Sequence, residues 1–420
     1  MNLRNRVFVL FLGQLVYSAC CASSTESTVV INTHKDIRDF NVGQLGHEFN
    51  DNKTKLIKIE KNGTLLFKNY SNLQQQELTP SINNYGTLLF TTPELTRSQK
   101  YETQLRSLSD GTGLYTIYIA NPYPNQHQVI NNYNTVKITD YSDFVFLEGY
   151  HTQNIYNNFK KTVVEKNAMF KIGKKKHTFT SQLKVQYINK KGAETIIDGS
   201  DKQEGHKAHI FIEGKNKTDE AYKNDGKTNV LSGAMYVNNA TYLDSGTTFV
   251  DENSSLNLDQ AQYILQRTAQ LTLNGTLSIS NGSVISVKDN AIFDLSKLKK
   301  TNLFYNCVTT KYTQMTTEIK FEDHSRIKIP HKEFGGEKQG NTYKFIPNIQ
   351  GNITIEMPQS LFDAAGLAVQ EANNSIDNKF KLFEAILKET KIEFTGTTEK
   401  AQFAQYETEN NECDETYDEC

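Results

Sequence analysis

The chain has 420 residues, long enough for two or three domains or for one long solenoid. Its formal net charge of −2 at pH 7 does not indicate a nucleic-acid partner, because domains that bind the phosphate backbone carry excess positive charge. Seven prolines are too few for a proline-rich disordered chain, so the composition leaves a folded protein with a polar surface.

The first 22 residues are ordered like a secretory signal peptide. Two arginines precede an apolar stretch over 7–16, and small residues follow up to Ala22, where we expect cleavage. The apolar stretch is shorter than the roughly 20 residues that a membrane-spanning helix needs. We therefore predict a secreted or cell-surface protein. Cys20 and Cys21 leave open a lipid anchor, so that a membrane would be reached only through such an anchor or through separate display machinery.

Two near copies of one turn and strand follow the N-terminal region. The sequence N-G-T-L-L-F over 62–67 returns as Y-G-T-L-L-F over 85–90, at an offset of 23 residues, and Ile59 falls on Ile82 under the same shift. The glycine before each strand suits a turn. The Gly-Thr-Leu part returns at 275–277, so the same repeat unit is expected near both ends of a long region.

Short strand candidates fill the region between these units. They are rich in β-branched and aromatic residues, are bounded by Asn, Asp and Gly, and lie at 114–119, 136–138, 144–147, 183–188, 209–212 and around Val230. Two stretches rich in Gly, Asp and Lys, 106–113 and 199–229, are expected to be loops that project from the strands.

The clearest pattern is an offset of 21 residues within 234–298. Four columns of apolar residues recur at this offset: Met235, Leu256, Leu277 and Leu298; Val237, Leu258 and Ile279; Leu243, Ile264 and Ile285; and Val250, Leu271 and Ile292. A fixed period of this size predicts a solenoid, in which each coil buries its apolar face on its neighbours. A meandering β-sandwich, the alternative, would not keep a constant long-range offset.

Three short strands make up each predicted coil. Strand candidates within the repeat start about seven residues apart, and their inward residues alternate with Thr, Ser, Asn or Asp. They lie at 234–237, 241–243, 247–250, 255–258, 263–265, 270–273, 277–279, 284–287 and 291–295. We predict an all-β fold, a β-solenoid in the form of a right-handed parallel β-helix, over 23–298, because stacked coils pair every backbone group.

The pattern changes after Leu298. Residues 299–357 offer terminal strands, whereas 358–394 have the apolar spacing of helices. We expect this helical segment to cap the open end of the solenoid, which needs protection against edge pairing. An acidic tail follows over 395–420.

Three cysteines remain if the first two are removed with the signal peptide. Cys413 and Cys420 flank a short acidic stretch and are placed to close a disulfide loop outside the cell. Pairing of Cys307 with either of them is the alternative, and the sequence does not choose between the two. Zinc is not indicated, because none of these cysteines has a C-x-x-C partner or a nearby His.

One basic patch is the candidate binding site. It consists of Lys174, Lys175, Lys176, Lys190 and Lys191. Such a patch suits anionic glycans or phospholipid head groups, although charge runs are more often a solvated hairpin surface.

The sequence offers no comparable support for a catalytic site. The sequence contains no P-loop, nucleophile elbow, zinc-protease motif or Rossmann fingerprint. Seven aspartates suit polysaccharide cleavage or calcium binding only if they share one face: Asp198, Asp201, Asp244, Asp251, Asp259, Asp289 and Asp294. At the offset of 21, Asp251 falls on Thr272 and Phe293, so the acids form no column. We predict no catalytic residue, no metal and no cofactor.

Three features together resemble a known family. They are the signal peptide, the repeated Asn-Gly-Thr-Leu units and the run L-N-G-T-L-S-I-S-N-G-S-V over 273–284. This combination resembles the passenger region of bacterial autotransporters, which implies a right-handed β-helix displayed at the outer membrane. The resemblance covers 48–298. It departs from the family in the tail cysteines and in a helical pattern where the family has a membrane β-barrel.

The function expected from these patterns is that of a non-catalytic adhesin. Exposed ladders of Thr, Asn, Ser and Tyr on the coils would contact a host surface protein or glycan, and no nucleic acid. A polysaccharide-degrading β-helix enzyme is the first alternative. A structural surface or coat protein that self-associates through its coils is the second.

Overall fold

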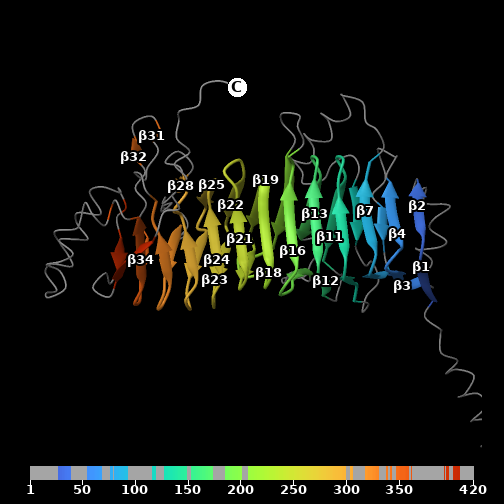
Figure 1. The fold of residues 1–420 in the computed structure, drawn as a ribbon, viewed down its shortest axis with the longest axis horizontal. Helices are drawn as coiled ribbons and strands as arrows, with labels where there is room; N and C mark the ends of the chain where they lie inside the picture. The colour runs from blue at the N-terminus through green and yellow to red at the C-terminus, as the bar shows by residue number, and fades with distance from the viewer. Residues whose placement is uncertain are drawn as a thin grey trace, which may run out of the picture.

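The computed structural model describes residues 27–38, 54–68, 76–78, 80–92, 116–119, 127–148, 153–173, 185–200, 207–298, 303–305 and 317–330, together with short segments between 337 and 406. Within these residues every element is a β-strand, and the strands stack into one elongated β-helix (Figure 1). The predicted all-β solenoid is confirmed. No described residue belongs to a helix long and apolar enough to cross a membrane.

Three strands form each coil, one in each of three parallel sheets that we name A, B and C. One coil consists of β20 (Thr241–Asp244), β21 (Thr247–Val250) and β22 (Ser255–Asp259), and the next repeats them as β23 (Gln262–Leu265), β24 (Gln270–Leu273) and β25 (Thr276–Ser280). Each of these strands pairs in parallel with the strand three places further along the chain. This repeated pairing satisfies the backbone of one coil with that of the next.

The other strands follow the same order. Sheet A also contains β1 (Ser27–Ile31), β3 (Thr54–Ile59), β6 (Ser81–Asn84), β9 (Val129–Asn132), β12 (Asn154–Asn158), β15 (Val185–Asn189), β18 (Glu220–Asn224), β26 (Val284–Val287), β29 (Glu318–Phe321), β33 (Asn348–Ile349) and β35 (Thr395–Gly396). Sheet B also contains β2 (His34–Arg38), β4 (Thr64–Lys68), β7 (Thr87–Thr91), β10 (Thr135–Ile138), β13 (Lys161–Glu165), β16 (Glu194–Asp198), β27 (Ile292–Asp294), β30 (Arg326–Lys328), β34 (Thr354–Pro358) and β36 (Gln402–Tyr406).

Sheet C is the shortest of the three in the described residues. It also contains β5 (Gln76–Leu78), β8 (Thr116–Ile119), β11 (Asp143–Leu147), β14 (Met169–Gly173), β17 (Ala208–Glu213) and β28 (Leu303–Tyr305). The long strand β19 (Lys227–Asn238) runs through sheet B and on into sheet C. A separate antiparallel pair is formed by β31 (Glu337–Lys338) and β32 (Asn341–Thr342).

The core is a narrow column inside the coils. In most strands of sheets A and B buried and half-buried residues alternate, as expected when one face of a strand points inward. Phe67, Phe90, Phe144 and Phe170 stack along the axis, with successive ring centroids 5.3, 4.3 and 5.2 Å apart. The apolar core therefore continues from coil to coil without a break over this stretch.

A stack of buried tyrosines continues the core on sheet A. It consists of Tyr156, Tyr187, Tyr222, Tyr242 and Tyr263, whose successive centroids lie 4.8, 4.7, 4.6 and 4.6 Å apart. The first four hydroxyls hydrogen-bond to threonines of sheet B: Thr162, Thr195, Thr228 and Thr248. The last, Tyr263, donates to Asp244 over 2.8 Å. Each buried hydroxyl thus has a partner, which buried tyrosines require.

Of the four predicted apolar columns, one is confirmed in full and one in its first three members, both on sheet C. Met235, Leu256 and Leu277 are paired in register, as are Val237, Leu258 and Ile279. The next partner of Leu277 is Leu303, so the extension of this column to Leu298 is wrong. On sheet C, residues 21 positions apart in the sequence are therefore paired over three coils.

The predicted column on sheet A is wrong. Leu243 pairs with Ile264, but both are half-buried on the outer face, and the next partner is Ser286 instead of Ile285. The inward column is Tyr242, Tyr263 and Ile285. The three residues that connect β25 to β26, against two between β22 and β23, lengthen this coil by one residue. A shift of one residue moves a strand's inward set to the other face.

The predicted column on sheet B is wrong for the same reason. Leu271 pairs with Thr248 and Phe293, whereas Val250 pairs with Leu273. Ile292 is only half-buried and lies beside Gln270 on the outer face. The turn before β24 has four residues and the turn before β21 has two, which changes the offset between these strands.

The upstream copies are confirmed in their strands. Leu65 pairs with Leu88 and Phe67 with Phe90, at the predicted offset of 23. The extension of this offset to Ile59 is wrong, because Ile59 pairs with Asn84.

Segment boundaries differ from those expected. The stretch 199–229, expected as a projecting loop, contains β17 and β18, and their Ile210, Ile212 and Tyr222 are buried in the core. Coils also continue beyond Leu298 as far as β36, into the stretch expected as an acidic tail. Residues 1–22 and 106–113, most of 358–394, and the cysteines Cys307, Cys413 and Cys420 lie outside the described residues.

Candidate binding edge between sheets A and B

The corner between sheets A and B has turns of two lengths. Two-residue turns occur at 32–33, 85–86, 133–134, 159–160, 225–226 and 245–246, and four-residue turns occur at 60–63, 190–193, 266–269, 288–291, 322–325 and 350–353. A four-residue turn extends further outward from the coil than a two-residue turn. Consecutive coils with short turns therefore project less than the neighbouring coils. We call this line of turns the A–B edge.

The type of residue that ends each sheet A strand correlates with the length of the turn that follows it. Before five of the six short turns it is Asn or Asp, the exception being Ile31, whereas before five of the six four-residue turns it is an aliphatic or aromatic residue. At three of these turns the side-chain oxygen accepts the backbone N–H two residues on: Asp244 from Gly246 over 3.0 Å, and Asn132 from Asn134 and Asn224 from Gly226 over 3.3 Å. Such Asx turns fix a tight reversal.

These same residues form the inner amide ladder. It consists of Asn84, Asn132, Asn158, Asn189, Asn224 and Asp244, all fully buried. Each Asn Nδ2 donates to the Oδ1 of the next member over 2.9 or 3.0 Å. Each Nδ2 also donates to a backbone carbonyl at the start of the next sheet B strand. The short turns are thereby tied to one another from inside.

Asp244 ends this ladder and carries the clearest electrostatic signal in the core. Its Oδ1 accepts from Asn224 Nδ2, and its Oδ2 accepts from the hydroxyls of Thr248 and Tyr263. Burial raises the pKa of the Asp244 carboxyl to about 6, although these hydrogen bonds act in the opposite direction. In the next coil the same position is Leu265, which can neither donate nor accept through its side chain.

Three aromatic side chains line the first run of short turns, and we call them the aromatic ladder. Tyr85 stacks on Tyr133, and Tyr133 on Phe159, in both cases with ring centroids 4.7 Å apart and planes within 10° of parallel. The rings are 39%, 38% and 39% exposed, which makes this the main aromatic surface of the described residues. Backbone hydrogen bonds of 2.8 Å hold the turns of Tyr133 and Phe159 to the preceding coil.

A second row of amides runs beside the aromatic ladder, on the outer face of sheet A. Asn131 Nδ2 donates to Asn83 Oδ1 over 2.9 Å, and Asn157 Nδ2 donates to Asn131 Oδ1 over 3.0 Å. Each of these half-buried asparagines lies two residues before a ring of the ladder. We call them the outer amide ladder.

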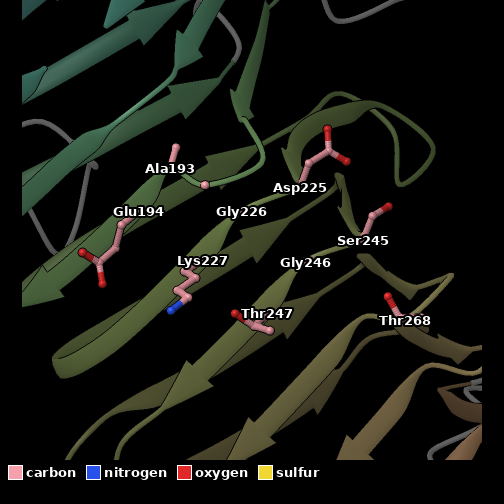
Figure 2. Close-up of a pocket in the computed structure, with 10 residues that line it drawn as sticks. Ala193, Glu194, Asp225, Gly226, Lys227, Ser245, Gly246, Thr247 and Thr268 are labelled. Carbon is pink, nitrogen blue, oxygen red and sulfur yellow. The ribbon is translucent and has the colours of Figure 1, made fainter. Parts of the chain in front are cut away.

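A polar groove of about 400 Å³ occupies the second run of short turns. Its lining comes from 192–194, 225–227, 245–247 and Thr268, so two short turns form the floor between two longer turns (Figure 2). Gly226 and Gly246 make this floor possible. A Cβ on Gly246 would lie 2.1 Å from the carbonyl oxygen of Gly226, closer than any side chain tolerates.

Polar and charged groups surround the groove. Glu194 accepts from Asn229 Nδ2 over 2.7 Å, and Ser245 Oγ accepts from Gln266 Nε2 over 3.0 Å. Lys227 and Thr247 are exposed. Asp225 Oδ1 is buried without a hydrogen-bond partner, and Oδ2 of the same carboxylate lies 3.6 Å from Lys223 Nζ.

The predicted basic patch lies partly on this edge. Lys190 follows Phe159 in the adjacent coil, and its Nζ lies 5.9 Å from the centre of the Phe159 ring. Lys191 is exposed in the same four-residue turn. Lys174, Lys175 and Lys176 lie outside the described residues. The sequence did not point to the aromatic ladder, although its repeated Asn-Asn-Tyr and Asn-Asn-Phe triplets were a readable signal.

The candidate acids do not converge. Asp244 is inside the coil, Asp251 lies at a turn from sheet B to sheet C, and Asp289 is on the A–B edge. Asp294 lies near Lys328, with 3.6 Å between Oδ2 and Nζ. Among the described residues no three His, Cys, Asp or Glu side chains are grouped as metal ligands.

His209 belongs to a different surface, the outer face of sheet C. It is buried beside the rings of Phe211 and Tyr236, and burial lowers its pKa to about 4. The imidazole is therefore neutral at physiological pH.

No known protein family, curated protein or solved structure matches the chain. The likeness to autotransporter passengers thus stays a prediction from the sequence pattern.

Proposed function

We propose that the protein is a non-catalytic binding protein of the cell surface or extracellular space, and that its A–B edge holds an oligosaccharide. The observation that carries this proposal is the aromatic ladder with its parallel outer amide ladder. Rings with phenol hydroxyls and amides offer both apolar contact and hydrogen bonds, which the mixed C–H and O–H surface of a sugar chain needs. The polar groove continues the same edge with hydroxyl and carboxylate groups.

The geometry supports binding without turnover. The ladder members repeat at the spacing of the coils, so one ligand chain would meet the same groups several times along a fixed line. Backbone hydrogen bonds and the inner amide ladder hold the turns in place before any ligand arrives, which reduces the entropy lost on binding. Among the described residues the candidate aspartates do not converge into a pair placed to cleave a glycosidic bond.

The location outside the cell is the second part of the proposal. The order of residues 1–22 supports export, and the resemblance to autotransporter passengers supports display as an adhesin. A host glycan, free or attached to a surface protein, is then the partner.

The experiment incubates the full chain with immobilised neutral and charged polysaccharides and measures both retention and released sugars. We expect retention without product. Replacing the ladder rings together, as Tyr85→Thr, Tyr133→Thr and Phe159→Thr, should weaken retention at least tenfold. The matched control is Tyr141→Thr, a half-buried tyrosine at the corner between sheets B and C.

Three results would contradict the proposal. Release of sugars without stable retention would identify an enzyme. Retention by no polysaccharide would remove the ligand class altogether. Equal retention by the ladder variant and the control, both with the unaltered circular dichroism spectrum, would place the binding site elsewhere.

A further inference from the structure

The rings of the aromatic ladder present their edges, and not their faces, to a ligand. Their planes are nearly parallel and their ring centroids lie 4.7 Å apart, so each internal ring face packs against its neighbour. The edge of an aromatic ring carries partial positive charge and the face partial negative charge. A sugar ring or nucleobase cannot stack between these side chains, whereas electron-rich oxygens can approach their edges.

Lysines without acidic partners surround one end of the ladder. Lys160 Nζ donates to Asn134 Oδ1 over 2.8 Å, and Lys190 Nζ lies over the Phe159 ring. Lys191 is exposed beside them. None of the three forms an ion pair with a described residue, in contrast to Lys171, which pairs with Glu213 over 2.9 Å on sheet C.

Among the described residues, the other end of the ladder has one paired and one unpaired lysine. Lys58 Nζ lies 5.8 Å from the Tyr85 ring centre and is neutralised by Glu60 over 2.8 Å. Lys61, exposed in the same turn, has no ion pair with a described residue. The surface is thus locally positive, although the whole chain carries a formal charge of −2.

From this charge pattern we infer that the aromatic ladder binds an anionic polysaccharide, one that carries carboxylate or sulfate groups. The acid groups lie against Lys160, Lys190 and Lys191, and the sugar oxygens between them meet the ring edges and the outer amide ladder. This inference rests on the proposed function and names the ligand class of the same site.

The test compares polymers that differ in charge. Dextran and dextran sulfate share a backbone and isolate the effect of sulfate, and polygalacturonate tests carboxylate. We expect at least one of the two anionic polymers to bind the full chain at least tenfold more tightly than dextran at 0.15 M NaCl. Its affinity should fall as salt is raised, because ion pairs at an exposed surface are screened. The salt series needs no variant and so does not depend on one that folds.

A triple variant tests the place of binding. Lys160→Gln, Lys190→Gln and Lys191→Gln together should weaken binding of the anionic polymer at least tenfold. The control, Lys217→Gln, Lys288→Gln and Lys297→Gln, removes the same charge elsewhere on the coils and should change affinity less than twofold. Thermal melting of both variants verifies the fold, and the single variant Lys190→Gln replaces the triple variant if that one unfolds.

The failures are distinguishable. Equal affinity for dextran and both anionic polymers, still lost in the ladder variant, would leave the proposed function in place and overturn the anionic class. No binding to any polysaccharide would overturn both. Tighter binding to anionic phospholipid vesicles or to single-stranded oligonucleotide would overturn the choice of ligand, and equal loss in both lysine variants would overturn the assigned position.

Discussion

At the scale of single residues, Asp244 is the most unusual feature of the core. It is fully buried, and its oxygens accept hydrogen bonds from an amide, two hydroxyls and the Gly246 N–H. These bonds satisfy the carboxylate, but burial still raises its pKa from 3.8 to about 6. The ionised form thus weakens the fold near neutral pH.

The pH dependence of folding should report this residue. Because the folded pKa lies above the unfolded one, the folded state binds more protons, and the stabilisation is complete below about pH 4 and lost as the pH rises through about 6. The difference between a pKa of 3.8 and one of about 6 corresponds to at most ~3 kcal/mol of folding free energy. We expect Asp244→Asn to be more stable than the unaltered chain at pH 7.5, with a smaller difference at pH 4.

Urea unfolding of both proteins across this pH range measures the difference. The comparison cancels the opposite contribution of His209, whose lowered pKa makes the fold lose stability as the pH falls. A stability difference that does not change with pH would show that Asp244 titrates normally.

At the scale of elements, the inner amide ladder and the tight turns form one unit. Each buried Asn joins two coils through its neighbour's side chain and through a backbone carbonyl. Removing one member leaves several buried polar groups without partners, each of which costs about 1–3 kcal/mol.

Two adjacent asparagines separate this effect from that of surface polarity. Asn158 belongs to the inner ladder, and Asn157 to the outer amide ladder on the opposite face of the same strand. We expect Asn158→Leu to lower the free energy of unfolding by at least ~2 kcal/mol. The same change at Asn157 should cost less than about 1 kcal/mol, because its groups can bond to water. Chemical denaturation compares the two, and equal losses would mean that the inner ladder adds no stability.

The sequence predicts the bounds of these strands well, but it predicts poorly which residues of each strand point inward. Residues 247–250, 270–273 and 284–287 were predicted with the bounds that β21, β24 and β26 have. The local alternation of apolar and polar residues is enough for that. The prediction of which residues of β20 and β23 point inward was wrong. Their orientation depends on the lengths of turns and connections, which apolar periodicity does not report.

The site was less predictable than the fold. Lys190 and Lys191 were found as a charge run, but the ladder beside them depends on Tyr85, Tyr133 and Phe159 being neighbours across 48 and then 26 residues. The irregular separations arise because different lengths of chain lie between successive turns. No constant offset could have aligned these rings.

At the scale of the whole molecule, the coils form a one-dimensional array. Each coil contacts mainly the coil before and the coil after it, as the strand pairings show. Stability in such an array is a sum of coil terms and neighbour terms, so damage should stay local.

Hydrogen exchange can test this locality. Leu271→Ala removes a core side chain between Thr248 and Phe293, at a cost of about 2–5 kcal/mol. We expect faster exchange in β21, β24 and β27 and unchanged exchange in β4 and β7. Leu88→Ala, in β7, should give the reverse pattern. Faster exchange along the whole chain in both variants would show a single cooperative unit.

The two turn lengths on the A–B edge have a consequence for how this surface can change. Glu194 after a four-residue turn and Lys227 after a two-residue turn both bond back to the preceding coil, over 2.7 and 2.9 Å. The chain therefore re-enters sheet B in step after turns of either length. The exposed turn residues, and with them the specificity of the edge, can therefore change one coil at a time without rebuilding the core, whereas Gly226 and Gly246 must stay because a Cβ there would clash with backbone.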